Sequence, residues 1–291
     1  MSSVLLIANP SAGGGRVPKL LPAVRRKLDA LGISHRTGLT TCLEDAVALT
    51  NEALDRGELP VAFSGDGVAG VVARTASFRE GATFGVLPGG TGNDFCGHVG
   101  IPQDPIEACD VLRDGVATAI DMGEANGERF LGIASFGYDS LANEAANDAP
   151  RWLGGGVYLW GAFLALVRWK GASFKLDVDG ERYEFDGWSV VCANTSRYGS
   201  GMLIAPDASV EDGRFDLVWT LASGKLRFLA SLPRVFKGTH IEDENVRVVH
   251  GVNVSVSSST DFVVYADGDP LTRLPAEIRL IPKAVKVMLP A

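Results

Sequence analysis

Residues 87–95 are Leu87-Pro88-Gly89-Gly90-Thr91-Gly92-Asn93-Asp94-Phe95, and they follow a short apolar run, residues 83–86, that predicts a buried strand. Three glycines in four positions let the backbone turn sharply and approach a ligand closely. Backbone N–H groups in such a turn can form a cradle for an anion. A single glycine-rich turn is a weak signal. Two more such turns, residues 9–15 and 64–67, each follow another predicted strand.

The first 120 residues alternate between strand and helix patterns. Apolar runs predict strands at 4–8, 33–40, 60–63 and 83–86, and helical spacing predicts helices at 18–31, 41–55, 68–76 and 104–113. The second helix opens on Thr41 to Glu44, which fit a capping box. This alternation predicts an α/β domain, a parallel sheet with helices on both faces. Ligands of such sheets bind beyond the carboxyl ends of the strands, where all three glycine-rich turns fall.

From about residue 120 the chain alternates short β-like runs with turns, which predicts a mostly antiparallel β-sandwich. The predicted strands are 130–136, 173–178, 182–185, 188–193, 215–220, 245–249, 252–257, 262–266, 276–281 and 285–289. Two helical stretches interrupt them, the very apolar 157–169 and the basic, amphipathic 226–236. We therefore expect two domains, residues 1–120 and residues 121–291.

Composition narrows the class of protein. The net charge of −8 opposes binding to nucleic acid, so we expect no such partner. The four cysteines form no CxxC pair, which is typical of free thiols in a reducing cytosol. The N-terminus lacks the pattern of a signal peptide, and the longest apolar stretch, residues 155–167, is too short to span a bilayer. We expect a cytoplasmic protein, and the sequence leaves open whether it forms a homodimer or another oligomer.

The three turns match neither the Walker A sequence nor the GxGxxG dinucleotide motif. Their combination instead resembles the diacylglycerol kinase and sphingosine kinase superfamily of lipid kinases. The motifs that carry this resemblance are 9–14, 65–67 and 87–95, followed in order by 100–102, 121–123, 134–137, 199–202, 205–208, 212–216 and 267–269. The resemblance implies an NAD kinase/diacylglycerol kinase-like fold, with a nucleotide-binding first domain and a lipid-substrate second domain. It implies transfer of the γ-phosphate of ATP to a lipid hydroxyl in a cleft between them, with diacylglycerol giving phosphatidic acid for phospholipid biosynthesis.

The resemblance assigns nucleotide binding to the three turns and to Thr41. The residues are Asn9, Pro10, Ser11, Ala12, Gly13, Thr41, Ser64, Gly65, Asp66, Gly67, Gly90 and Thr91. Phosphoryl transfer depends mainly on positioning and charge neutralisation, which backbone N–H groups in these turns can supply. Arg16 can add a positive charge, although a solvated arginine at a helix start is the commoner case.

Asp66, Asp94 and Asp121 each lie at or just after a predicted strand end. Three carboxylates at one site are costly unless a cation joins them. By resemblance they hold or orient Mg²⁺ through water, and Asp66 also takes part in catalysis. The alternative for each is a helix N-cap or a turn aspartate.

A hydroxyl acceptor needs a base to take its proton. The family places a carboxylate at the end of an Asp-Gly-Glu turn, which Asp267-Gly268-Asp269 matches, so Asp269 is the expected general base. Asp179-Gly180-Glu181 is a rival that its chain position marks as a hairpin turn. By resemblance, Ser209, Asp212 and Arg214 form a structural Mg²⁺ loop. A turn with an acidic cap is the competing interpretation.

The second turn departs from the family pattern. Ser64, Val68 and Gly70 stand where the family usually has glycine, threonine and asparagine. Loss of a hydroxyl and an amide keeps two rivals to the lipid kinase open: a soluble NAD kinase-like enzyme and a non-catalytic nucleotide or lipid sensor.

A lipid substrate requires access to a membrane surface. Residues 225–237 mix cations with apolar side chains, as a peripheral, interfacial helix does. Trp152, Tyr158, Trp160 and Trp169 also suit an interface, although core packing is the commoner role for such aromatics.

Overall fold

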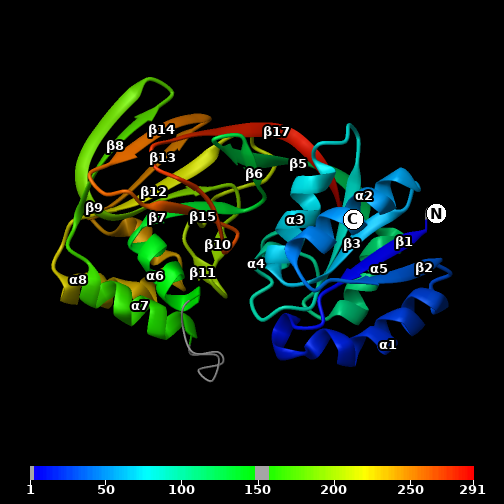
Figure 1. The fold of residues 1–291 in the computed structure, drawn as a ribbon. Helices are drawn as coiled ribbons and strands as arrows, with labels where there is room; N and C mark the ends of the chain where they lie inside the picture. Colours follow the sequence, from blue (N-terminus) through cyan, green and yellow to red (C-terminus); the bar gives the residue numbers. More distant parts are fainter. Residues whose placement is uncertain (1–2, 148–156) are drawn as a thin grey trace. The chain divides into compact units, whose positions relative to one another are not determined.

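The structure is a computed structural model that describes residues 3–147 and 157–291, and it forms two compact units (Figure 1). The α/β unit comprises residues 1–122, 197–201 and 282–291, and the β unit comprises residues 123–196 and 202–281. Three segments of the predicted second domain, 121–122, 197–201 and 282–291, thus belong to the α/β unit. Residues 282–291 do so because Lys286 and Val287 of the last strand pair in parallel with Thr83 and Phe84.

The sheet of the α/β unit has the strand order β4-β3-β1-β2, and all its strands run parallel. The strands are β1 (Val4–Ala8), β2 (His35–Leu39), β3 (Leu59–Ser64) and β4 (Thr83–Pro88). Every residue of β1 is buried, as its unbroken apolar run predicts for a strand covered on both faces. The predicted parallel sheet is therefore confirmed.

Helices cover both faces of this sheet (Figure 1). They are α1 (Arg16–Ala30), α2 (Leu43–Asp55), α3 (Asp66–Ala76), α4 (Asp94–His98) and α5 (Pro105–Asp114). Helices α1 and α5 pack together on one face, and α2 and α3 pack together on the other. Helix α1 begins two residues before the predicted Pro18, directly after a glycine in the left-handed region, Gly15.

The β unit is built from antiparallel strands, as predicted. They run in the order β16-β15-β7-β9-β8-β14-β17, and β12 pairs with β9 and β13. Their bounds are β6 (Glu128–Phe130), β7 (Ile133–Gly137), β8 (Ala172–Val178), β9 (Glu181–Ala193), β11 (Met202–Leu203), β12 (Phe215–Leu221), β13 (Val246–Gly251), β14 (Asn253–Ser258), β15 (Val263–Ala266) and β16 (Asp269–Arg273). Strands β5 (Val116–Ala125) and β17 (Ala276–Leu289) each contribute residues to both units, and β10 (Arg197–Tyr198) lies in the α/β unit.

The sequence predicted interruptions in two strands that are continuous in the structure. Strand β9 is continuous through 186–187, and β17 is continuous through 282–284, because a local irregularity leaves each strand paired on both sides of it. In β17, Pro282 cannot donate to a ladder and Lys283 has a φ of 51°. A proline at this position in the sequence is typical of a turn, which is why an interruption was predicted here.

In the described part of the β unit three helices interrupt the strands, where two were predicted: α6 (Tyr138–Asn147), α7 (Val157–Arg168) and α8 (Lys225–Val235). A 3-10 turn, η3 (Thr239–Glu242), follows α8. Helix α6 was missed because its composition is mixed and polar, and tertiary contacts with α7 support it. Among residues 3–147 and 157–291, no helix combines the length and apolar character needed to cross a bilayer.

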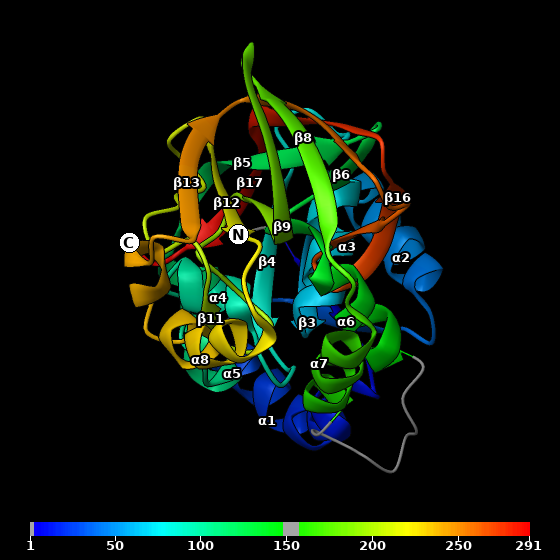
Figure 2. The ribbon, with the colours of Figure 1, turned by 90° about the vertical axis from the view of Figure 1, so that its left-hand side faces the viewer.

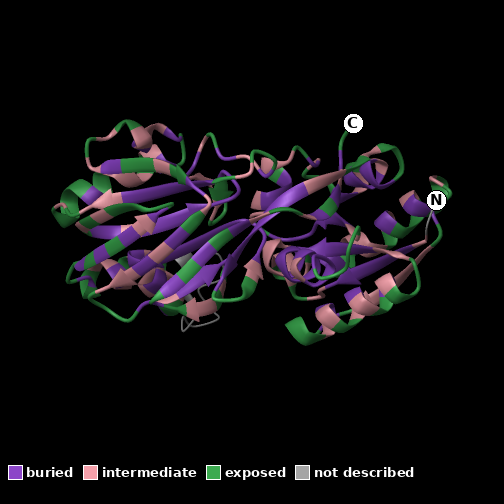
Figure 3. Cartoon of the chain, turned by 90° about the horizontal axis from the view of Figure 1, so that it is seen from above, coloured by how far each residue is buried: buried purple, intermediate pink, exposed green. Residues whose placement is uncertain are grey.

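The core of the β unit is rich in aromatic rings. Trp188 stacks on Trp169 with ring centroids 5.5 Å apart and on Phe228 with centroids 4.0 Å apart. Figure 3 shows buried residues running along the strands of each unit, and exposed residues gathered on loops and outer helix faces. Trp169 is therefore a core residue, while Trp152 and the side chain of Tyr158 lie outside the described residues.

Candidate functional site

The three glycine-rich turns meet at the carboxyl edge of the α/β sheet. A Cβ atom built on Gly13 would lie 2.5 Å from the carbonyl oxygen of Gly89, and one built on Gly90 would lie 2.5 Å from the Cα of Gly65. Contacts this short exclude any side chain larger than hydrogen. The turns after β1, β3 and β4 therefore pack backbone against backbone, and the convergence expected from the sequence is present.

Some backbone N–H groups of the first turn form hydrogen bonds within the turn itself. The side chain of Asn9 accepts from the N–H of Ser11 at 2.9 Å, and the N–H of Ala12 donates to the carbonyl of Asn9 at 3.1 Å. Gly13, Gly14 and Gly15 follow with positive φ values. An anion bound at Ser11 or Ala12 has to compete with these internal acceptors.

The third turn is closed by Asn93, whose φ of 52° places it in the left-handed region. Its side-chain oxygen accepts from the N–H of Gly90 at 2.8 Å, and its amide nitrogen donates to the carbonyl of Gly90 at 3.3 Å. Asn93 is 5% exposed, so its role is to hold the turn. The expected phosphate donor at Gly90 is engaged by Asn93 in this structure.

The second turn leads into α3 and offers backbone donors. Gly65 is the N-cap, and no side chain caps the helix. The first N–H groups of an α-helix have no acceptor within the helix, and they favour anions. Asp66, Gly67 and Val68 carry these groups here, and Val68 is only 5% exposed. The residue that replaces a family hydroxyl is thus an apolar side chain packed inside the unit.

Thr40 is a candidate that the sequence reasoning missed. Its N–H donates to the carbonyl of Ala8 at the end of β1. Its hydroxyl is buried and has no hydrogen-bond partner among the described residues. A buried polar atom without a partner is costly, and a polar ligand at this edge of the sheet would relieve that cost.

Thr41, the adjacent residue that was predicted to bind nucleotide, forms hydrogen bonds with Asp45 instead. Its N–H and its hydroxyl both donate to the carboxylate of Asp45 at 2.7 Å. The capping box lies one residue later than predicted, with Cys42 as N-cap and Asp45 at the third helical position, because Asp45 rather than Glu44 reaches back to these groups.

Asp66 and Asp94 lie close together. The carboxylate of Asp66 accepts from the N–H of Phe95 at 3.0 Å, and the carboxylate of Asp94 accepts from the N–H of Ser200 at 2.8 Å. Burial, and after it the negative charge of Asp66, raise the pKa of Asp94 above its usual value. The backbone N–H of Ser200 and the positive charge of Arg197 oppose this shift.

Asp121 has a different environment. It is 1% exposed on β5, and its carboxylate accepts from the N–H of Lys283 at 2.8 Å. Among the described residues no group of three His, Cys, Asp or Glu side chains is placed to hold a metal ion directly. The donor chemistry of Asp66 and Asp94 fits an oxygen-preferring cation such as Mg²⁺, and the contribution of Asp121 stays a prediction.

The expected general base lies on a hairpin of the β unit. Asp267 and Gly268, with φ values of 53° and 93°, form a two-residue turn between β15 and β16, and Asp269 is the first residue of β16. Positive φ at both positions is the geometry that Asp-Gly favours. Asp269 is partly buried at this position.

Asp267 anchors this hairpin, a role that sequence reasoning missed. Its carboxylate accepts from the N–H groups of Leu131, Gly132 and Ile133 at 2.7, 2.8 and 3.2 Å. The rival motif does form a hairpin turn, between β8 and β9, where Asp179 and Gly180 have positive φ.

The predicted structural metal loop is stabilised internally. The carboxylate of Asp212 accepts from the Nε of Arg214 at 2.9 Å and from its N–H at 3.3 Å, and the hydroxyl of Ser209 accepts from the N–H of Glu211. An acid-capped turn accounts for these contacts. Mg²⁺ at this loop therefore stays a prediction.

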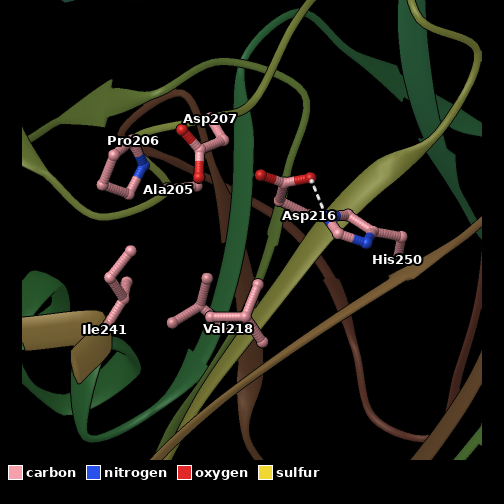
Figure 4. Close-up of a pocket in the computed structure, with 8 residues that line it drawn as sticks. Ala205, Pro206, Asp207, Asp216, Val218, Ile241 and His250 are labelled. Atoms are coloured by element: carbon pink, nitrogen blue, oxygen red, sulfur yellow. Dashed lines mark ion pairs between the residues drawn. The ribbon is translucent and has the colours of Figure 1, made fainter. Parts of the chain in front are cut away.

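A surface cavity of about 250 Å³ lies beyond this loop in the β unit (Figure 4). Asp207 and the ion pair of Asp216 with His250, 3.2 Å apart, line one part of it. Val218 and Ile241 line another part. Burial raises the pKa of Asp216, and the facing His250 opposes this shift.

Family models and full-length relatives match the chain. Residues 3–125 match the diacylglycerol kinase catalytic domain, and residues 132–289 match the YegS C-terminal NAD kinase beta sandwich-like domain. A protein of Mycobacterium tuberculosis named diacylglycerol kinase is 33% identical over 300 residues, covering 100% of this chain and 96% of the relative. One of Bacillus subtilis with the same name is 30% identical over 294 residues, covering 100% and 97%.

A solved structure has the same fold as this chain. A crystal structure described as a putative diacylglycerol kinase from Bacillus anthracis superposes with a TM-score of 0.84 at 24% identity, covering 99% of this chain and 95% of that chain. Because the sequence identity is below 25%, this similarity shows only that the two chains share a fold. The chain belongs to the diacylglycerol kinase family, a class of lipid kinases, as its full-length relatives and both domain matches establish.

Proposed function

We propose that the protein transfers the γ-phosphate of ATP to the free hydroxyl of diacylglycerol, giving phosphatidic acid and ADP. The observation that carries the proposal is the convergence of three glycine-rich turns beside the paired carboxylates of Asp66 and Asp94. The names of the full-length relatives support diacylglycerol as the acceptor.

Nucleotide binding is assigned to this edge of the α/β sheet. The first-turn N–H groups of α3 face no acceptor within their helix and are suited to phosphate oxygens. The orphan hydroxyl of Thr40 offers a further donor. When bound, Mg²⁺ neutralises phosphate charge, and Asp66 and Asp94 are the residues that would hold it.

The carboxylate of Asp269 takes the proton of the lipid hydroxyl as that oxygen bonds to the γ-phosphorus. The bond from the γ-phosphorus to its bridging oxygen breaks, and ADP carries away the electron pair. The hairpin anchored by Asp267 keeps Asp269 at a fixed place on β16. Asp269 is one methylene shorter than the glutamate common in the family, so its reach is shorter.

The test is transfer of labelled γ-phosphate from ATP into lipid in mixed micelles. The acceptors are diacylglycerol, a sphingoid base, ceramide and a polyprenol, with NAD as a soluble acceptor. We expect labelled phosphatidic acid. Transfer to NAD alone would favour the soluble kinase, and nucleotide binding without transfer to any acceptor would favour the sensor, for which Val68 and Gly70 are the motivation.

A further inference from the structure

Two helices of the β unit carry apolar side chains on their outer faces. On α7, Trp160, Phe163 and Val167 are exposed and spaced three and four residues apart, so they form one stripe. On α8, Leu226 and Leu229 are exposed in the same way, and the stripe continues to Phe236 at the end of the helix. We call these six residues the α7–α8 face.

The inner faces of the same helices are fixed to the core. Tyr138 donates its hydroxyl to the carbonyl of Ala162 on α7, and its ring meets that of Phe228 on α8 edge to face. Lys225 on α8 donates to the carbonyl of Val167 on α7 at 3.2 Å. Figures 1 and 2 both show the two helices at the same end of the β unit. Both helices are therefore held against the core at this end of the β unit.

The two helices that carry this face contain cations but no acidic residues. The chain as a whole carries a net charge of −8, yet segments 157–170 and 224–237 contain no acidic residue. They contain six cations: Arg168, Lys170, Lys225, Arg227, Arg234 and Lys237. Arg227 and Arg234 pair with the neighbouring acidic residues Glu242, Asp243 and Glu244, and Arg168, Lys170 and Lys237 are further exposed cations. Cations beside an apolar stripe are complementary to a lipid bilayer with anionic head groups.

We propose that the α7–α8 face docks on an anionic lipid bilayer and inserts its six side chains among the acyl chains. The exposed cations Arg168, Lys170 and Lys237 contact phosphate head groups. The inference adds a partner to the proposed function, and vesicle binding can be measured without turnover.

The experiment measures co-sedimentation with phosphatidylcholine vesicles that do or do not contain phosphatidylglycerol, without ATP or diacylglycerol. The variant is Phe163→Asp combined with Leu226→Asp. The matched control is Phe78→Asp combined with Leu39→Asp, because those phenylalanine and leucine side chains are 63% and 59% exposed, against 58% and 84% on the α7–α8 face. Thermal unfolding shows whether both variants remain folded.

We expect binding to vesicles that contain phosphatidylglycerol, and a loss of affinity of roughly 100-fold in the α7–α8 variant. The control variant should bind as the wild type does. Equal binding by both variants would overturn the proposal. A dimer in solution that the α7–α8 variant dissociates would also overturn it, because the face would then be a subunit interface.

Trp160 provides a second readout that does not depend on a charged substitution. In a Trp152→Phe background, lipids brominated in the acyl chain should quench its fluorescence, and adding Trp160→Phe should remove most of the quenching, since Trp169, Trp188 and Trp219 are buried. Undiminished quenching in Trp160→Phe would count against insertion.

A soluble short-chain diacylglycerol separates docking from catalysis. The α7–α8 variant should phosphorylate it as fast as the wild type does, while losing activity on diacylglycerol in vesicles. Phosphorylation without vesicle binding by the wild type would overturn docking alone. Vesicle binding without phosphorylation of any lipid would overturn the proposed function alone.

Discussion

Asp267 and Asp269 stand two residues apart on one hairpin, and the structure gives them different surroundings. Asp267 accepts three backbone N–H groups, so its carboxylate holds the segment from Leu131 to Ile133. Asp269 begins β16 and is partly buried. At the scale of the residue, we interpret Asp267 as structural and Asp269 as the general base.

Substituting the two aspartates should separate these roles. We expect Asp269→Asn to lower kcat at least about 100-fold with an unchanged unfolding midpoint, since a general base contributes that much. We expect Asp267→Ala to lower the free energy of unfolding by about 3 kcal/mol, since three donors lose a charged acceptor. Urea unfolding measures the stability of each variant, and a lipid phosphorylation assay measures its kcat. Full activity in Asp269→Asn would remove Asp269 from the mechanism.

Thr40 offers a sharper test of the nucleotide site. Thr40→Val keeps the side-chain volume and removes a hydroxyl that has no partner among the described residues. The unfolding midpoint should stay equal or rise, while the dissociation constant for ATP should rise about fivefold, as expected for one hydrogen bond. Calorimetric titration measures the affinity. Unchanged ATP affinity would mean that the nucleotide does not reach Thr40.

The elements were more predictable than the contacts between their side chains. The runs of β1, β3 and β4, and the turns after them, follow from hydrophobic patterning and glycine punctuation. Helix α6 does not follow from patterning, because it depends on contacts with α7 that only folding brings about. The acceptor of Thr41 is local, but the pattern does not decide between Glu44 and Asp45. Similarly, nothing local shows that Asn93 engages Gly90, or that Asp267 reaches residues 131–133.

The packing of the turns makes a prediction at the scale of elements. Gly90→Ala places a Cβ 2.5 Å from the Cα of Gly65, so the second and third turns must separate. We expect ATP affinity to fall by about tenfold or more, because the backbone donors lose their positions. Gly97→Ala is the control, since its Cβ would meet only the side chain of Gln103, at 3.5 Å. Equal ATP affinity in the two variants would contradict the account.

The link between β2 and β3 predicts a pH dependence. The guanidinium of Arg36 donates to both oxygens of Glu58, and this pairing lowers the pKa of Glu58 below its usual 4.5. A lowered pKa means that the folded state prefers the ionised carboxyl group, so the stabilisation is complete above pH 4.5 and is lost as the pH falls through the lowered value.

Glu58→Gln should therefore be less stable than the wild type at neutral pH, and the difference should shrink in acid. Urea unfolding at several pH values measures it, with Glu80→Gln as the control, because Glu80 is exposed and forms no ion pair within residues 3–147 and 157–291. A difference that grows as the pH falls would contradict this sign.

At the scale of the whole molecule, the chain joins an α/β unit that carries the glycine-rich turns to a β unit that carries Asp269 and the α7–α8 face. Family membership followed from motif order along the sequence, and full-length relatives confirm it. The lipid acceptor was not predictable in the same way, because acceptor choice depends on the shape of a binding site that a motif does not encode.

The most direct measurement compares the initial rates at which the wild type and Asp66→Asn move labelled γ-phosphate from ATP to diacylglycerol in mixed micelles. The account predicts labelled phosphatidic acid from the wild type, and a rate at least about 100-fold lower from a folded Asp66→Asn variant. Equal rates, or no labelled lipid from the wild type, would contradict it.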